Sequence, residues 1–161
     1  MYEDRFSNWR SWGERDDYSD VSRPGVYVIA LSNNTLSGRS FSWRKDVVYI
    51  GMSNAVAGLK GRLQQFDNTM RGKRGHGGAD RLRFKHRGYQ TFRTEAYVAV
   101  APFDCEPASQ RPRDLRVMGE VARFEYWCLA HFADRFGRLP EFNDKKMAPK
   151  YSRAVARSRR R

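Results

Sequence analysis

Glu125 is the residue of this chain that most clearly points to catalytic or binding chemistry, because it is a carboxylate on the apolar face expected for a long helix. Residues 114–136 form the longest helical pattern, with Asp114 expected as the N-cap and Gly137 and Pro140 closing it. A step of about 100° per residue predicts an apolar face that includes Glu125. The apolar members of that face are Leu115, Met118, Val121, Ala122, Tyr126, Leu129, Phe132, Ala133 and Phe136.

Two interpretations of Glu125 follow from this position. A carboxylate facing a core costs several kcal/mol unless it is paired, protonated or bound to a cation. Glu125 could therefore sit at the edge of the helix, reaching water or pairing with one of the many arginines. Alternatively it is a hard oxygen ligand at the floor of a cleft, which suits Mg²⁺ because that ion keeps most of its waters. The helical pattern leaves both interpretations open.

The elements that must position this helix begin with two β-rich runs, residues 26–31 and 46–50. Turn signals between the runs, Asn33-Asn34 and Ser37-Gly38, favour an antiparallel pair with an inserted turn or hairpin. A short amphipathic helix begins near Gly58.

A Gly-rich basic loop follows at residues 70–78, and a third strand lies within residues 92–100. This order of elements predicts an α+β domain, a small three-stranded antiparallel sheet flanked by helices.

The length of 161 residues indicates one folded domain. Residues 1–22 are polar with isolated aromatic side chains, and we interpret them as an N-terminal arm that packs on the domain without forming a core element. Residues 23–144 make the domain itself. Residues 145–161 form a basic tail, expected to be mobile or to become ordered on binding.

The formal net charge of +13 favours polyanionic partners, nucleic acid first and an acidic membrane or protein surface second. The excess is concentrated in two segments. Residues 60–93 hold ten Lys or Arg against two acids, and residues 145–161 hold eight against none.

Several classes of protein are disfavoured. Cys105 and Cys128 lack the spacing of a zinc site, and the N-terminus lacks a charged start followed by an apolar run. No run of about 18 apolar residues is present. We therefore expect a cytoplasmic protein without a membrane partner, as a monomer or a homodimer.

Two tripeptides on the first two predicted strands, Gly25-Val26-Tyr27 and Tyr49-Ile50-Gly51, resemble the motif pair of the GIY-YIG nucleases. The family carries an Arg on the next helix, a Glu on a later helix and an Asn about fifteen residues further on. Arg62, Glu125 and Asn143 stand at these places, so the resemblance covers about three quarters of the chain.

Three departures accompany the resemblance. The connection between Tyr27 and Tyr49 is longer than in compact members, and so is the loop before Arg62. Position 66 is Phe, where many members have His or Tyr. His76 resembles a loop histidine of some homing endonucleases and is the candidate for the missing group.

The resemblance implies a divalent-metal-dependent endonuclease that hydrolyses phosphodiester bonds in DNA, with Mg²⁺ (or Mn²⁺) bound by Glu125. Arg62 would contact the non-bridging phosphate oxygens. Tyr27 and Tyr49 would flank the attacking water, with Tyr27 as the base, and Asn143 would hold the scissile region. The expected catalytic residues are Tyr27, Tyr49, Arg62, Glu125, Asn143 and His76.

Bases on the helix that carries Arg62 and directly after it are expected to guide the nucleic acid through its phosphates. These residues are Lys60, Arg71, Lys73, Arg74, Arg81, Arg83, Lys85 and Arg87. The basic tail is either a second contact or a feature that promotes solubility.

Two alternatives remain open, together with RNA in place of DNA. One is a catalytically inactive nucleic-acid-binding protein with the GIY-YIG fold, which Phe66 favours. The other is a basic structural protein of a ribonucleoprotein or phage particle, which leaves Glu125 unexplained.

Overall fold

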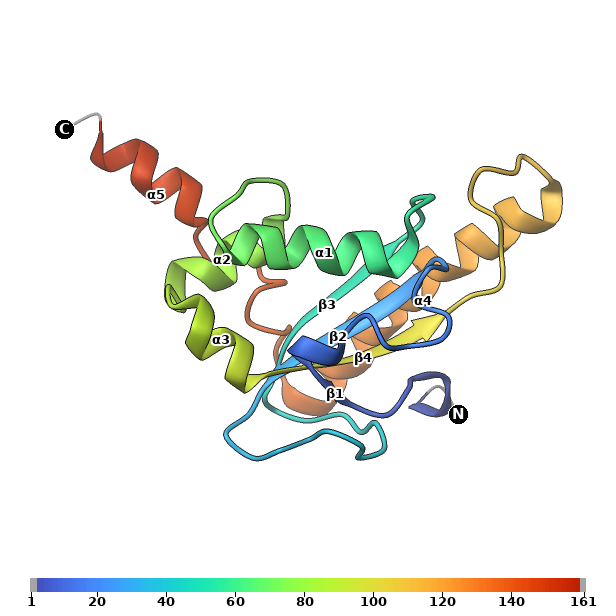
Figure 1. Ribbon diagram of the computed structural model, residues 1–161, viewed down its shortest axis with the longest axis horizontal. Coiled ribbons are helices and arrows are strands. Elements are labelled where there is room, and N and C mark those ends of the chain that lie inside the picture. Colours follow the sequence, from blue (N-terminus) through green and yellow to red (C-terminus); the bar gives the residue numbers. More distant parts are fainter. Residues whose placement is uncertain (1–2, 160–161) are drawn as a thin grey trace.

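A four-stranded antiparallel sheet in the order β1-β4-β2-β3 forms the centre of the protein (Figure 1). The computed structural model describes residues 3–159, without the side chain of residue 154; the ends of the predicted arm and tail, residues 1–2 and 160–161, lie outside the described residues. The strands are β1 (Arg10–Ser11), β2 (Gly25–Leu31), β3 (Val47–Ser53) and β4 (Ala96–Pro102). The α-helices are α1 (Gly58–Met70), α2 (Gly77–Lys85), α3 (Tyr89–Glu95), α4 (Pro112–Phe136) and α5 (Tyr151–Ser158), and short 3-10 helices span Glu3–Arg5 and Trp12–Glu14.

The α+β class is confirmed, but the predicted number of three strands is wrong. The additional strand, β1, pairs with β4 through Arg10↔Val98 and Ser11↔Tyr97. A strand of two residues carries no alternation of polar and apolar side chains, so no periodic pattern could reveal it.

Both faces of the sheet are covered, as β2 shows, because its residues from Gly25 to Ala30 are all buried. Val26 and Val28 pack with Phe124 and Phe132 of α4 on one face. Tyr27 on the other face packs with residues of α1, α2 and α3. Alternate residues of a strand point to opposite faces, so β2 is apolar throughout because it serves two cores.

The N-terminal segment supplies core residues, contrary to the prediction for residues 1–22. Trp9 and Trp12 are almost completely buried, one in each of the two cores. The Trp12 indole Nε1–H donates a hydrogen bond of 2.8 Å to the buried Asp67 on α1. The aromatic side chains of this segment are therefore structural anchors.

The long helix α4 differs from its prediction in start and orientation. It begins at Pro112, with Arg111 at the N-cap, so Asp114 lies inside its first turn. Its buried apolar side chains are Val121, Phe124, Cys128 and Phe132, whereas Leu115 is 53% and Tyr126 73% exposed. The covered face is thus rotated from the predicted one, because packing on the sheet selects the aromatic Phe124.

Three helices occupy segments predicted to be irregular or extended. α2 begins within the Gly-rich loop, α3 occupies the first part of the predicted third strand, and α5 lies in the tail. These helices have only seven to nine residues, too few for an apolar period to be recognised in the sequence.

The connection over residues 32–46 holds turns and buries Leu36, Phe41 and Trp43 against the α4 side of the sheet. Within residues 3–159, no helix is long and apolar enough to cross a membrane.

Candidate active site

Tyr27 and Tyr49 project from the same face of the sheet. Tyr27 stands opposite Gly51 in the antiparallel register, and Tyr49 lies two residues before Gly51 on β3. Residues directly opposite each other, and those two apart on one strand, share a face. The two phenol ring centroids are 6.0 Å apart.

Two glycines make room for these phenols. A Cβ atom on Gly51 would lie 2.6 Å from Tyr27 Oη and 2.8 Å from Tyr49 Cε1. A Cβ atom on Gly78, in the first turn of α2, would lie 2.2 Å from the Tyr49 ring. Contacts that short are not tolerated, so a side chain at either position would push the two tyrosines apart.

His76, the N-cap of α2, reaches the Tyr27 hydroxyl. Its Nδ1 accepts a hydrogen bond of 3.2 Å from the Ala79 N–H, and its Nε2 lies 2.7 Å from Tyr27 Oη. A ring whose Nδ1 accepts must carry its proton on Nε2, so we assign Nε2–H as the donor to Tyr27. Burial, reinforced by Arg62 and Arg81, lowers the pKa of His76 to about 3 and keeps the ring neutral.

Phe66 forms the apolar wall behind these groups. Its ring centroid is 4.7 Å from that of His76 and 5.7 Å from that of Tyr49. Phe66 is itself fully buried. The histidine predicted to compensate for Phe66 thus packs directly against it.

Arg62, on α1, contributes the positive charge of the site. Its Nη1 donates to Gln65 Oε1, while its Nε is buried without a hydrogen-bond partner among the described residues. Burial raises the pKa of Tyr27 well above its usual value of 10, Tyr49 adds to this rise, and the Arg62 guanidinium opposes it. Burial also raises the pKa of Tyr49, again opposed by Arg62.

Glu125 lies on α4, and its charge acts on both tyrosines while that of Arg62 acts on Glu125. It is partly buried, and among residues 3–159 no side chain or backbone group forms a hydrogen bond or ion pair with its carboxylate. Burial raises its pKa, whereas the charges of Arg62 and Lys145 lower it. An unpaired, partly desolvated carboxylate fits a hard divalent cation.

The same carboxylate would be the main protein ligand of such a cation. No group of three or more His, Cys, Asp or Glu suited to a metal ion occurs in the described part of the chain. Mg²⁺ is commonly held by one or two carboxylates with several waters, so a single Glu suffices for its attachment.

Asn143 binds the backbone of β3. Its Oδ1 accepts from the Ile50 N–H at 2.8 Å, and its Nδ2 donates to the Ile50 carbonyl at 2.7 Å. The Phe142 N–H donates to the Val48 carbonyl. Together they close the open edge of the sheet. We therefore interpret Asn143 as a residue that positions β3, and with it Tyr49, in place of the expected role of holding the scissile region.

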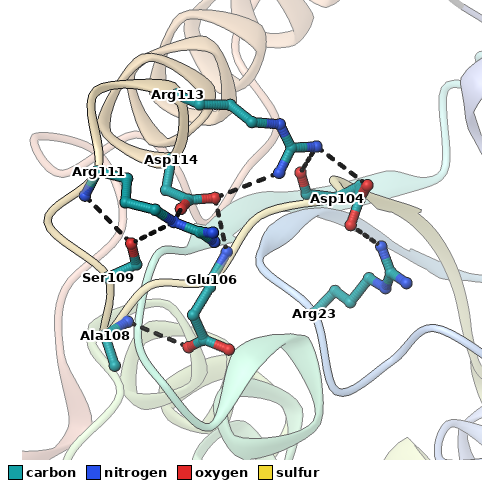
Figure 2. A network of polar contacts seen from close by, with 8 residues as sticks. All are labelled: Arg23, Asp104, Glu106, Ala108, Ser109, Arg111, Arg113 and Asp114. Atoms are coloured by element: carbon teal, nitrogen blue, oxygen red, sulfur yellow. Dashed lines mark hydrogen bonds and ion pairs between the residues drawn. The ribbon is translucent and has the colours of Figure 1, made fainter.

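A polar network at the start of α4 was not predicted from the sequence (Figure 2). The buried Asp114 accepts from the Glu106 N–H at 3.1 Å and from Arg111 Nε at 2.9 Å. Arg113 joins Asp114 to Asp104, which pairs with Arg23 just before β2. The network fixes α4 relative to β2, and therefore Glu125 relative to Tyr27.

The eight bases predicted to contact nucleic acid have different surroundings. Lys60, Lys73 and Arg74 are exposed. Arg71 and Lys85 are exposed but paired with Asp67 and Glu141.

The three others lie on or beside α2. Arg83 stacks on the Tyr151 ring at 4.2 Å, and Arg87 lies 5.8 Å from the same ring. Arg81 alone is buried. The exposed cations can thus reach a long polyanion from solution, and Arg81 is the one whose charge acts on Tyr49.

Five separate segments of the chain thus contribute to the candidate site: they carry Tyr27, Tyr49, Arg62, His76 and Glu125. Such a group could bind a phosphate, hold a cation beside it and move a proton. No family model, curated protein or solved structure matches this chain.

Proposed function

We propose that this protein is a Mg²⁺- or Mn²⁺-dependent endonuclease that hydrolyses phosphodiester bonds in DNA. The observation that carries the proposal is the unpaired carboxylate of Glu125, held beside Arg62 and the two tyrosines. The resemblance of Gly25-Val26-Tyr27 and Tyr49-Ile50-Gly51 to the GIY-YIG motifs supports the same reaction.

Tyr27 is the proposed base. Burial raises its pKa well above 10, while the Arg62 guanidinium and the Nε2–H of His76 favour the phenolate form. The base role therefore requires the positive charge of a bound divalent cation to lower this pKa further. The phenolate takes a proton from the attacking water as the new P–O bond forms and the bond to the leaving oxygen breaks. The leaving oxygen takes up a proton from solvent.

The other residues bind and orient. Glu125 would hold a divalent cation, which when bound would supply Lewis acidity toward the phosphate. Arg62 is only partly buried, and its guanidinium has N–H donors beyond the Nη1 bond to Gln65 that would bind a non-bridging phosphate oxygen. Tyr49 orients the water, and Asn143 positions Tyr49 through β3.

The test is incubation of plasmid DNA with the protein in Mg²⁺, in Mn²⁺ and in excess EDTA, followed by sequencing of any ends. We expect nicked or linear products with either metal and none in EDTA. Glu125→Ala should be inactive. Glu120→Ala should cleave like the wild type, because Glu120 is exposed on the same helix and paired with Arg123. Cleavage by Glu125→Ala, or in EDTA, would contradict the proposal.

A catalytically inactive nucleic-acid-binding protein is the second candidate. The observation in its favour is that Tyr27 is 0% exposed and packed near the apolar Phe66. It predicts binding that weakens steeply with salt and no cleavage with any divalent metal. An RNA duplex of the same sequence, run beside the plasmid, separates DNA from RNA as the substrate.

A further inference from the structure

A basic groove of 620 Å³ lies between α2 and the C-terminal segment that leads into α5. Six of the residues that line it are cations and none is an acid: Arg81, Lys145, Lys146, Lys150, Arg153 and Arg157. α5 extends from the end of the molecule that carries α2 and α3, as Figure 1 shows. A groove of one sign of charge attracts polyanions strongly.

Arg81 is the unusual member of this groove. Its residue surface is only 8% exposed, yet it has no hydrogen bond or ion pair with any described residue. Buried guanidinium groups are ordinarily paired, because desolvating a charge without a partner is costly. Arg81 thus presents guanidinium donors without a partner among the described residues to a groove lined by cations, which suits an anion.

A second cation converges on the same point. A Cβ atom placed on Gly77 would lie 3.5 Å from Lys150 Nζ and 3.6 Å from Arg81 Nη1. Gly77 is the first residue of α2, a helix of nine residues. The partial positive charge of a helix N-terminus adds to the two cations and favours an anion there.

The acids around the groove are already engaged. Both oxygens of Asp80 accept hydrogen bonds from Ser152, at 2.6 Å from its hydroxyl and at 3.3 Å from its backbone N–H. Glu141 pairs with Lys85 at 2.6 Å. The contacts of Asp80 hold the start of α5 against α2, and thereby bring Lys150 to Gly77.

The groove also adjoins the candidate active site. Lys145, one of its lining residues, lowers the pKa of Glu125 by its charge. The charge of Arg81 likewise acts on Tyr49 and His76. Charges that line the groove therefore act on three groups of the candidate active site, Glu125, Tyr49 and His76.

We propose that Arg81 and Lys150 form a second phosphate site, which binds a backbone phosphate of the strand whose scissile phosphate lies at Arg62 and Glu125. The role as a flanking site rests on the proposed nuclease function. The phosphate binding itself does not, because it would serve a non-catalytic nucleic-acid-binding protein equally. The site reads no bases, so its contribution is the same for every sequence.

The experiment measures binding without cleavage. Fluorescence anisotropy of labelled single-stranded and duplex DNA of about 20 nucleotides, in EDTA over a range of salt, compares the wild type with Arg81→Gln and Lys150→Gln. Each variant should bind about tenfold more weakly, the loss of one charge-assisted contact, with a salt slope reduced by about one. Arg39→Gln, in the connection between β2 and β3, is the matched control and should bind like the wild type.

Wild-type affinity in Lys150→Gln overturns the proposal, and thermal melting checks that Arg81→Gln is folded. The proposal is also overturned if poly-glutamate at matched charge competes with the labelled DNA as well as unlabelled DNA does. The site would then bind any acidic polymer. Failure of the plasmid assay alone, with both variants weakened in binding, rejects the nuclease function and leaves the phosphate site standing.

Discussion

Asp114 and Glu125 lie on the same helix, α4, but have opposite surroundings. Asp114 is fully buried and receives hydrogen bonds from the Glu106 N–H and Arg111, which together lower its pKa (Figure 2). Glu125 is partly buried, has no such partner within residues 3–159, and burial raises its pKa.

This difference distinguishes an acid that stabilises the fold from an acid that can bind a ligand or take part in a reaction. A carboxylate whose oxygens are saturated by donors stabilises the fold in its charged form, and has little capacity left for a ligand. A carboxylate that is desolvated and unpaired costs stability, and this cost is tolerated at sites that bind cations or substrates. The comparison predicts that the two residues respond in opposite ways to the same kind of substitution.

The largest expected effect is the loss of cleavage in Glu125→Gln. Replacing the Glu125 carboxylate should lower single-turnover DNA cleavage by at least about a thousandfold, the upper range for one electrostatic group. The stability to urea should stay unchanged or rise, because a desolvated charge is removed. Glu120→Gln is the control; a marked loss of stability in Glu125→Gln would place Glu125 with Asp114 as a structural acid.

The next effect is that of Tyr27→Phe, which tests whether the neighbours of Glu125 share its chemical role. Loss of the phenol oxygen should slow cleavage about a hundredfold, a typical contribution of one acid–base group. DNA affinity measured in EDTA should not change, because Tyr27 is buried. Full cleavage by this variant would remove Tyr27 as the base.

A smaller effect, on stability and not on cleavage, is expected for Asp114→Asn. The amide cannot accept from Glu106 and Arg111 as the carboxylate does, so the melting temperature should fall by about 5 °C. Cleavage below the melting transition should remain near that of the wild type. A specific loss of cleavage in a stable Asp114→Asn protein would contradict the division between the two acids.

The smallest effect concerns His76, a third buried ionisable group. Its pKa of about 3 lies below the usual 6.5, so the unfolded chain binds a proton that the folded protein does not. Stability should therefore fall as the pH drops below about 6.5, approaching about 1.4 kcal/mol per pH unit from this residue. Urea unfolding at about pH 7.5, 6.5 and 5.5 measures how the free energy of unfolding depends on pH.

His76→Gln should show a flatter dependence over the same range. His86→Gln is the control, because His86 is only partly buried. Equal dependence in wild type and His76→Gln would mean that His76 is not held neutral, and would weaken its assigned donation to Tyr27.

The sequence predicted the larger elements well and the smaller ones poorly. The β-rich runs at β2 and β3 and the long pattern of α4 carry strong periodic signals, so they were found. β1 has two residues and α3 has seven, too short for a period to be visible. The predicted face of α4 was rotated because Phe124 and Cys128, both buried, were left out of it.

By itself, the sequence determined that β2 and β3 are extended, that α4 is helical, and that Glu125 lies beside a covered face, because these properties depend on neighbours within a few residues. Only the tertiary structure decided that His76 meets Tyr27 and that Asn143 clamps Ile50, contacts between residues 49 and 93 positions apart. It also decided that Asp114 is saturated while Glu125 has no such partner among the described residues. Such contacts depend on how helices and strands pack, and one helical period says nothing about which donors approach from another element.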